Sequence, residues 1–308
     1  MSSNNSYSVS GHQTGISPFK AWILASRPRT LPVSLPPIII GTALASHQVE
    51  HLNWMLAFFA LLCSLGIQIG TNLVNDALDF KKGADGPQRL GPLRATQGGL
   101  LSFKQVLTAG SLCFFFALLC GIPLVFAGGW PLALILILSV ACGYLYTGGP
   151  WPLAYTGISD FFVLLFFGWV STGTVYYLLT DKVDFPCFLA ATQIGLLAIV
   201  PHAINNLRDH VSDALVHKKT LAVRFGQNFA RREITVLSML PFMLGLLWIV
   251  EGSIWMSVLP LFVLPLVIRN LKAIWQTEPS PLYNEFLAKS ALCQLFFGCL
   301  LAAGSFLI

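Results

Sequence analysis

Residues 71–85 read TNLVNDALDFKKGAD and directly follow WMLAFFALLCSLGIQIG at 54–70, an apolar segment without a charged residue. A second polar stretch, NNLRDHVSDALVHKKTLAVRFG at 205–226, also follows a long apolar segment. Carboxylates and amides are costly to bury at a membrane boundary, so their presence there indicates a bound cation or substrate. These two stretches decide both the fold and the chemistry.

The composition is that of an integral membrane protein. The chain has 308 residues, of which 55% are hydrophobic and 10% are charged, whereas soluble domains carry about 25% charged residues. One bilayer crossing needs about 20 apolar residues. The apolar segments predict an all-α membrane protein with nine transmembrane helices, at 31–46, 53–75, 105–127, 130–147, 159–179, 186–206, 233–250, 252–269 and 286–307. Residues 1–18 are predicted to be a disordered cytoplasmic tail, and residues 19–308 a single transmembrane domain.

The basic residues set the orientation. If the N-terminus is cytoplasmic, 17 of the 18 Lys and Arg residues lie on the cytoplasmic side and only Lys182 lies outside. Such a bias is typical of multi-pass membrane proteins. It predicts that both polar stretches face the cytoplasm and that the C-terminus lies outside; the membrane itself is expected to be a bacterial inner membrane, as the family resemblance described below implies. The placement of the charges also argues against nucleic acid as a partner, despite a net charge of +5.

The two polar stretches form a weak internal repeat. Asp76 and Asp209 occupy equivalent positions, 133 residues apart. Two four-helix halves, each presenting an acidic helix end on the same side of the membrane, would produce this spacing. A ninth helix would complete the bundle.

The first stretch concentrates oxygen ligands on one helix face. Asn72, Asn75, Asp76 and Asp79 have the i, i+3, i+4, i+7 spacing that points side chains the same way. A break at Gly83 would let Asp85 fold back toward them. The second stretch repeats the pattern with three residues at i, i+4 and i+8, namely Asn205, Asp209 and Asp213.

Hard oxygen ligands suit Mg²⁺, which proteins often bind through one or two carboxylates together with substrate phosphates. Arg94 follows the first cluster, and Lys218 and Lys219 follow the second. Acids and bases around one cavity suit a polyanion carried on Mg²⁺, and apolar helices suit a long hydrocarbon. A lipid-soluble diphosphate fits both requirements. The alternative is that the acids are solvated helix ends paired with neighbouring Lys and Arg.

Both stretches resemble the two Asp-rich motifs of the UbiA superfamily of membrane prenyltransferases. Four segments resemble the branch that prenylates 1,4-dihydroxy-2-naphthoate for menaquinone synthesis: RPRTLPVSLPPIIIGTALA at 27–45, FKKGADGPQRLGPLRATQGG at 80–99, YTGGPWPLAYTGISDFFVLLFFGW at 146–169, and the stretch at 205–226. The resemblance implies a UbiA-like bundle and Mg²⁺-dependent transfer from polyprenyl diphosphate to that acceptor, with loss of CO₂ and diphosphate.

The resemblance also implies roles for individual residues. Asn72, Asp76 and Asp79 would form the first Mg²⁺-diphosphate site, and Asn205, Asp209 and Asp213 the second, with Asn75 and Asp85 as helpers. The hydroxybenzoate branch has basic residues in the loop after its fourth helix. The corresponding loop here, YTGGPWPLAYTG at 146–157, has none, so Arg94, Lys218 and Lys219, or Mg²⁺ alone, would neutralise the diphosphate.

The remaining expectations concern the reacting groups. Tyr146, Tyr155 and Phe162 are candidates to stabilise an allylic cation with their ring faces. Arg29 or Arg27 is a candidate to bind the acceptor carboxylate through a bidentate ion pair. Each has a plainer reading, as an interfacial aromatic or a topology-setting charge.

Two other functions remain open. A sister prenyltransferase acting on 4-hydroxybenzoate, homogentisate or haem would share every Mg²⁺ ligand. A cation transporter would place acids in a membrane pathway, but such acids normally lie at mid-membrane in interrupted helices.

Overall fold

The computed structural model describes residues 16–86 and 89–307, and these ranges are helical without any β-strand. The α-helices are α1 (Pro18–Ser26), α2 (Leu35–Ala45), α3 (Trp54–Lys81), α4 (Phe103–Gly128), α5 (Trp130–Leu145), α6 (Ser159–Leu164), α7 (Ser171–Thr180), α8 (Phe185–Leu215), α9 (Leu221–Leu244), α10 (Leu247–Val250), α11 (Ile254–Val258), α12 (Leu264–Gln276) and α13 (Tyr283–Ser305). Short 3₁₀ turns occupy η1 (Leu31–Ser34), η2 (Leu153–Tyr155) and η4 (Leu259–Val263), and a π-helical turn, η3 (Leu165–Val170), joins α6 to α7. Residues 1–15 of the expected tail lie outside the described residues.

Seven helical segments of the described chain have the length and apolar character to cross a membrane. They are Trp54–Lys81, Phe103–Gly128, Ser159–Thr180, Phe185–Leu215, Leu221–Val250, Ile254–Gln276 and Tyr283–Ser305. The other two expected spans fall on the shorter apolar helices Leu31–Ala45 and Trp130–Leu145. At 1.5 Å per residue, 16 residues cover about 24 Å, less than the roughly 30 Å hydrocarbon core. Helix length therefore does not establish the predicted count of nine.

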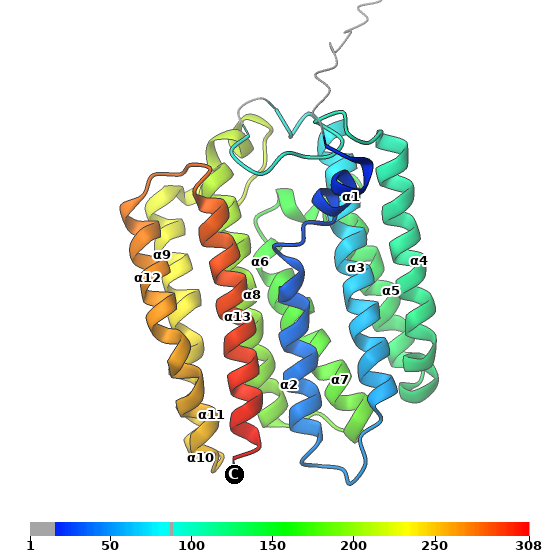
Figure 1. Cartoon of the computed structure of the whole chain (residues 1–308), viewed down its shortest axis with the longest axis vertical. Coiled ribbons are helices and arrows are strands. Elements are labelled where there is room, and N and C mark those ends of the chain that lie inside the picture. The colour runs from blue at the N-terminus through cyan, green and yellow to red at the C-terminus, as the bar shows by residue number, and fades with distance from the viewer. Residues whose placement is uncertain (1–15, 87–88, 308) are drawn as a thin grey trace, which may run out of the picture.

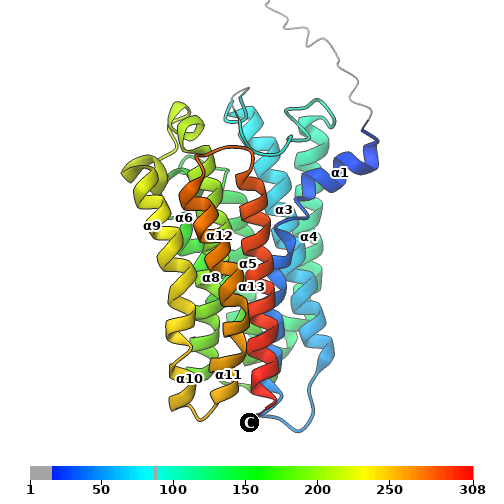
Figure 2. The ribbon, with the colours of Figure 1, turned by 60° about the vertical axis from the view of Figure 1, so that its left-hand side comes forward.

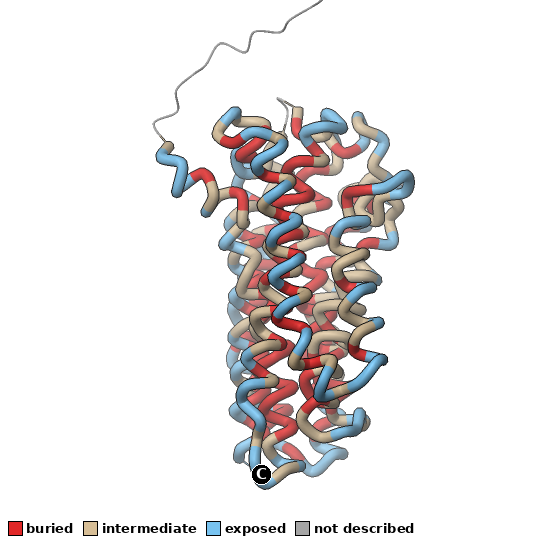
Figure 3. The backbone as a smooth tube through the Cα atoms, turned by 90° about the vertical axis from the view of Figure 1, so that its right-hand side faces the viewer, coloured by how far each residue is buried: buried red, intermediate tan, exposed pale blue. Residues whose placement is uncertain are grey.

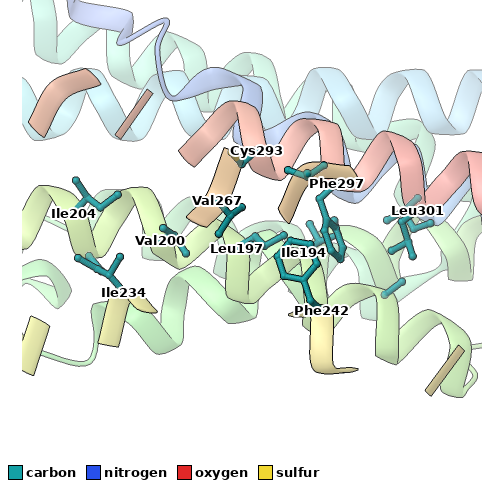
Figure 4. Close-up of a cluster of buried hydrophobic side chains, with 14 of the residues drawn as sticks. Ile194, Leu197, Val200, Ile204, Ile234, Phe242, Val267, Cys293, Phe297 and Leu301 are labelled. Carbon is teal, nitrogen blue, oxygen red and sulfur yellow. The ribbon is translucent and has the colours of Figure 1, made fainter. Parts of the chain in front are cut away.

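Helix α8 forms the centre of the bundle. It packs against α9, α13, α2 and the α6–α7 segment, and Figure 4 shows Ile194 and Leu197 of α8 meeting Phe242 and Phe297 in the largest apolar core. The outer helices leave large apolar side chains exposed, for example Phe115 and Phe126 on α4. Figure 3 shows the resulting buried interior and exposed periphery. An apolar exterior of this extent matches a lipid-facing surface.

Glycine allows α8 to approach the α6–α7 segment closely. A β-carbon on Gly168 would lie 2.6 Å from the carbonyl oxygen of Ala191 and 2.9 Å from the α-carbon of Gly195. Backbone atoms in two packed helices cannot move aside easily, so this crossing needs glycine.

We expect Gly168→Ala to destabilise the protein by about 1–3 kcal/mol through overpacking. The measurement is thermal unfolding of the detergent-purified protein. Gly173→Ala is the matched control, because a β-carbon there meets no atom within 4 Å, and it should leave the melting temperature unchanged or slightly higher. Equal melting temperatures for the two variants would contradict the close approach.

The two polar stretches end at the same end of the bundle. Figures 1 and 2 show that α3 and α8 both end at the end of the bundle that carries α1, with the C-terminus of the chain at the other end. Each helix terminates through a residue with positive φ. Gly83 (φ 69°) follows α3 and His217 (φ 58°) follows α8, a common way to satisfy the last carbonyls of a helix. The predicted break at Gly83 is confirmed.

Candidate active site

A cavity of about 320 Å³ opens between the ends of α3 and α8 and continues into the bundle. Its polar part is lined by Arg27, Asn72, Asn75, Asp79, Arg89, Arg94, Asn205, Asp209, Asp213 and Lys218. Its deeper part is lined by apolar side chains, including Ile38, Leu124, Leu132, Ile135, Phe162, Phe166 and Val175. One cavity therefore has a charged mouth and an apolar interior.

Asn75 and Asp79 attach the first stretch to basic groups. The amide oxygen of Asn75 accepts hydrogen bonds from Arg27 at 2.6 Å and from Arg94 at 2.9 Å. Asp79 accepts a hydrogen bond from the Tyr155 hydroxyl at 3.0 Å and lies 3.5 Å from Arg94. Both side chains are buried, so at the mouth one amide and one carboxylate are held against basic side chains.

Asp76 does not line the cavity. Its two carboxylate oxygens accept hydrogen bonds from the backbone N–H groups of Ala95 and Thr96, at 3.0 and 3.1 Å. The side chain is 1% exposed. Asp76 thus fixes the loop that carries Arg94, although the sequence predicted it as a direct ligand.

We expect Asp76→Asn to loosen this loop, because the amide NH₂ cannot accept one of the two backbone hydrogen bonds. Limited proteolysis of the 83–102 segment should become several-fold faster, with a parallel loss of activity. Asp79→Asn should lose activity without the change in proteolysis. If both variants are cut at the wild-type rate, Asp76 does not hold the loop.

Asp85 folds back to the same network. It pairs with Arg89 at 2.5 Å and lies 3.5 Å from Arg94. Burial raises the pKa of the Asp85 carboxyl to about 6, an effect that the neighbouring Arg89 opposes. Its Oδ2 atom and Nη1 of Arg94 are buried and find no hydrogen-bond partner within 16–86 and 89–307. Such orphaned polar atoms are expected where a charged ligand binds.

The second stretch is organised by Arg208. This buried guanidinium pairs with both carboxylate oxygens of Asp209, at 2.9 and 2.5 Å, and donates to Asn205 at 2.7 Å. It also donates to Asn284 at the start of α13, and Asn284 donates to the carbonyl of Leu90. A buried guanidinium of this kind orients the carboxylate beside it.

Lys218 connects the two stretches. Its ammonium lies 3.8 Å from Asp79 and 3.4 Å from Asp213. The turn at His217 returns the chain over the end of α8, where the Lys218 N–H donates to the Asp213 carbonyl at 3.0 Å. The acids of the two stretches are thus close enough for one cation to contact both.

Tyr155 lies among these charges. The ammonium groups of Lys82 and Lys218 each lie 4.9 Å from the centre of its ring, within the range of cation–π attraction. Burial and the adjacent Asp79 raise the pKa of the Tyr155 hydroxyl above its usual value, so it remains a proton donor. Burial lowers the pKa of the Lys82 ammonium, and Asp79 opposes that effect.

The sequence of this chain is similar to proteins of one known family. Residues 34–303 match the model of the UbiA prenyltransferase family. The chain belongs to this family. Among its relatives is the 1,4-dihydroxy-2-naphthoate octaprenyltransferase of Escherichia coli, 41% identical over 70% of this chain and 72% of that protein. The enzyme of the same name from Bacillus subtilis is 33% identical over 91% of this chain and 90% of that protein.

Solved structures show the same fold at low sequence identity. A UbiA homolog from Aeropyrum pernix superposes with a TM-score of 0.66 at 14% identity, covering 90% of this chain and 97% of that one. A UbiA homolog from Archaeoglobus fulgidus bound to GPP and Mg²⁺ gives a TM-score of 0.63 at 16% identity, covering 93% and 98%. The UbiA fold and the multi-pass membrane character of this chain are therefore established.

Two basic residues predicted for the site of this UbiA protein lie away from the cavity, whereas Asp85 and Tyr155 do not line it but contact residues that do. Arg29 and Lys219 are exposed, and neither lines the cavity. Lys219 instead uses its backbone N–H, which donates to the Tyr155 carbonyl at 3.0 Å. Arg27, with φ 55° after α1, lines the cavity in place of Arg29.

Sequence reasoning missed Arg208 and gave no role to His202. Arg208 directly precedes Asp209 in the polar C-terminal turns of α8, and a buried arginine requires a carboxylate partner; its place beside Asp209 was the available signal. His202 lines the cavity and contacts Tyr146. Nothing in the residue spacing distinguishes it from a structural histidine.

Proposed function

We propose that this protein transfers a polyprenyl group from polyprenyl diphosphate to 1,4-dihydroxy-2-naphthoate, with release of diphosphate and CO₂ to give demethylmenaquinol. The observation that carries the proposal is the contact of Lys218 with Asp79 and Asp213 at the mouth of a cavity with an apolar interior. A diphosphate fits the mouth and an isoprenoid fits the interior. The naphthoate acceptor is supported by the relatives that carry that activity in their names.

The residues at the mouth fit magnesium. Asn72, Asp79, Asp209 and Asp213 supply amide and carboxylate oxygens to one cavity, and such ligands together with phosphate oxygens suit Mg²⁺. When bound, Mg²⁺ would supply Lewis-acid stabilisation of the charge that develops on the leaving diphosphate. Asp85, with its orphaned oxygen, and Asp76, through the loop it fixes, support this arrangement.

The basic side chains hold the leaving group. Arg94 and Lys218 lie beside the carboxylates, and their positive charge favours breaking of the allylic C–O bond, with its electron pair moving to the diphosphate. The apolar interior keeps water away from the allylic carbon. Tyr146 and Tyr155 present weakly acidic hydroxyls and aromatic faces rather than strong nucleophiles.

The acceptor carboxylate is assigned to Arg27 rather than Arg29. Arg27 lines the cavity and donates to Asn75, whereas Arg29 is exposed. Attack of the electron-rich ring at the carbon that bears the carboxylate forms the new C–C bond. Departure of CO₂ leaves its electron pair with the ring and restores aromaticity.

We place the protein in a bacterial cytoplasmic membrane, as a single multi-pass domain of nine crossings, with the cavity mouth and N-terminus cytoplasmic and the C-terminus outside. The support is the distribution of Lys and Arg, which gather almost entirely at the end of the bundle that bears the cavity mouth. Thinning of the bilayer or side-chain snorkelling would accommodate the two short helices.

Magnesium removal tests the proposal. Membranes containing the protein, supplied with 1,4-dihydroxy-2-naphthoate and a polyprenyl diphosphate, should form prenylated product with Mg²⁺ and lose it in excess EDTA. Labelling the acceptor carboxylate separates the sister reactions, because the naphthoate reaction releases labelled CO₂ and 4-hydroxybenzoate prenylation does not. Activity that persists in EDTA would contradict the metal requirement, and cation uptake into vesicles without product would favour the transporter.

A further inference from the structure

A second polar cluster lies inside the bundle, below the charged mouth. It is centred on His202 of α8. Its Nδ1 atom is 3.3 Å from the Tyr146 hydroxyl, and its Nε2 atom is 3.0 Å from Ser159 Oγ and 3.3 Å from Asp160 Oδ1. The amide nitrogen of Asn206 lies 3.1 Å from Nε2; the Ser159 and Asp160 oxygens suit the Nε2–H tautomer, which leaves Nδ1 free to accept a proton from Tyr146. The imidazole is therefore fixed on both sides.

The Asp160 carboxylate faces this imidazole with an unsatisfied oxygen. Its Oδ1 atom is buried and has no hydrogen-bond partner among the described residues, although Nε2 lies 3.3 Å away. Protonation of His202 would turn this contact into an ion pair. Glu233 of α9 is a second carboxyl group close to Asp160. The arrangement stabilises an imidazolium by a carboxylate, as in catalytic His–Asp pairs.

The cluster lies where an acceptor ring would bind. His202 precedes Asp209 by seven residues, two helical turns, so it sits about 10 Å deeper on the same face of α8. Tyr146 and His202 both line the cavity, as does Phe162 of α6. The allylic carbon next to a diphosphate held at the mouth would lie between the charged network and this cluster.

We infer that His202 supports the reaction through Tyr146: it accepts the Tyr146 proton when Tyr146 takes a hydroxyl proton from the acceptor ring, and it later returns that proton. This role rests on the proposed function. As the ring carbon attacks the allylic carbon, the acceptor O–H proton moves to the Tyr146 oxygen, while the Tyr146 proton moves to Nδ1. The O–H electron pair forms a ring carbonyl, and the C–O pair leaves with the diphosphate.

The second half of the reaction reverses the proton transfer. The ring now carries a carbonyl beside the carbon that bears the carboxylate, an arrangement that readily loses CO₂. The electron pair of the broken C–C bond moves to the ring oxygen, which takes the proton back through Tyr146. No net proton is consumed, so the cluster needs no exchange with water in each cycle.

Replacement of His202 by Ala, with and without added imidazole, tests the inference. Loss of a general acid–base typically costs about 10²- to 10⁴-fold in rate, so we expect His202→Ala to lower kcat by at least about 100-fold. The KM for polyprenyl diphosphate should change little, because the mouth is intact. Added imidazole should restore part of kcat, since the cavity left by the side chain admits it. His202→Gln, which fills the same space, should be equally slow but not rescued.

His210 provides the matched control. It lies on the same helix and contacts the Leu207 carbonyl and Gln227 rather than the cavity, so His210→Gln should keep wild-type kcat. A His202→Ala protein with at least a third of wild-type kcat would overturn the inference, and so would a loss of rate that imidazole does not restore. Failure of the wild-type protein to prenylate dihydroxynaphthoate would instead overturn the proposed function.

Discussion

Asp79→Ala is expected to abolish prenyl transfer, with a fall in kcat/KM of at least about 1,000-fold. Asp79 lines the cavity and is the acid that Tyr155, Arg94 and Lys218 share. Its removal deletes an oxygen ligand and leaves three polar groups without their common partner. The measurement is product formation by membranes that contain equal amounts of inserted protein.

Glu285→Gln is the control for Asp79→Ala. Glu285 is largely exposed and pairs with Lys289 on α13, and exposed pairs of this kind contribute little. We expect wild-type activity. Substantial prenyl transfer by Asp79→Ala would show that the first stretch does not bind the diphosphate.

Lys218→Ala and Lys219→Ala should differ sharply although the residues are neighbours. Lys218 contacts acids of both stretches, so its loss should lower kcat/KM for polyprenyl diphosphate by about 100-fold, the typical cost of one charge-stabilising group. Lys219 is exposed and contributes its backbone. Lys219→Ala should therefore stay within about three-fold of wild type.

Steady-state kinetics at saturating acceptor, with the diphosphate concentration varied, measures the difference. Equal losses in the two variants would indicate a general effect of surface charge rather than a specific contact. A larger loss for Lys219→Ala would contradict the geometry of the turn at His217.

The sequence predicted the helices from their apolar runs, and it predicted that the two polar stretches lie at one end of the bundle from the distribution of Lys and Arg. Long apolar runs specify membrane helices, and the i, i+3, i+4, i+7 spacing placed Asn72 and Asp79 on one face. Both line the cavity. Asp76 shares that spacing, but it turns out to bind the backbone of the Ala95–Thr96 segment. Helical periodicity predicts the direction in which a side chain points, but it does not predict which group that side chain contacts.

The basic residues were harder to predict because they depend on turns. Lys218, not Lys219, reaches the acids since His217 has positive φ, and Arg27, not Arg29, lines the cavity since Arg27 also has positive φ. A turn of this kind reverses which of two nearby side chains faces inward. The role of Arg208 was not predicted, because its contact with Asn284 joins positions 76 residues apart.

The hydrogen bond from Arg208 to Asn284 couples the second polar stretch to α13. Arg208 holds Asp209 while Asn284 reaches the Leu90 carbonyl, so the second stretch, the loop after α3 and the first turn of α13 form one mechanical unit. Occupancy of the diphosphate pocket should accordingly slow amide exchange in the opening turn of α13, a segment that does not line the cavity.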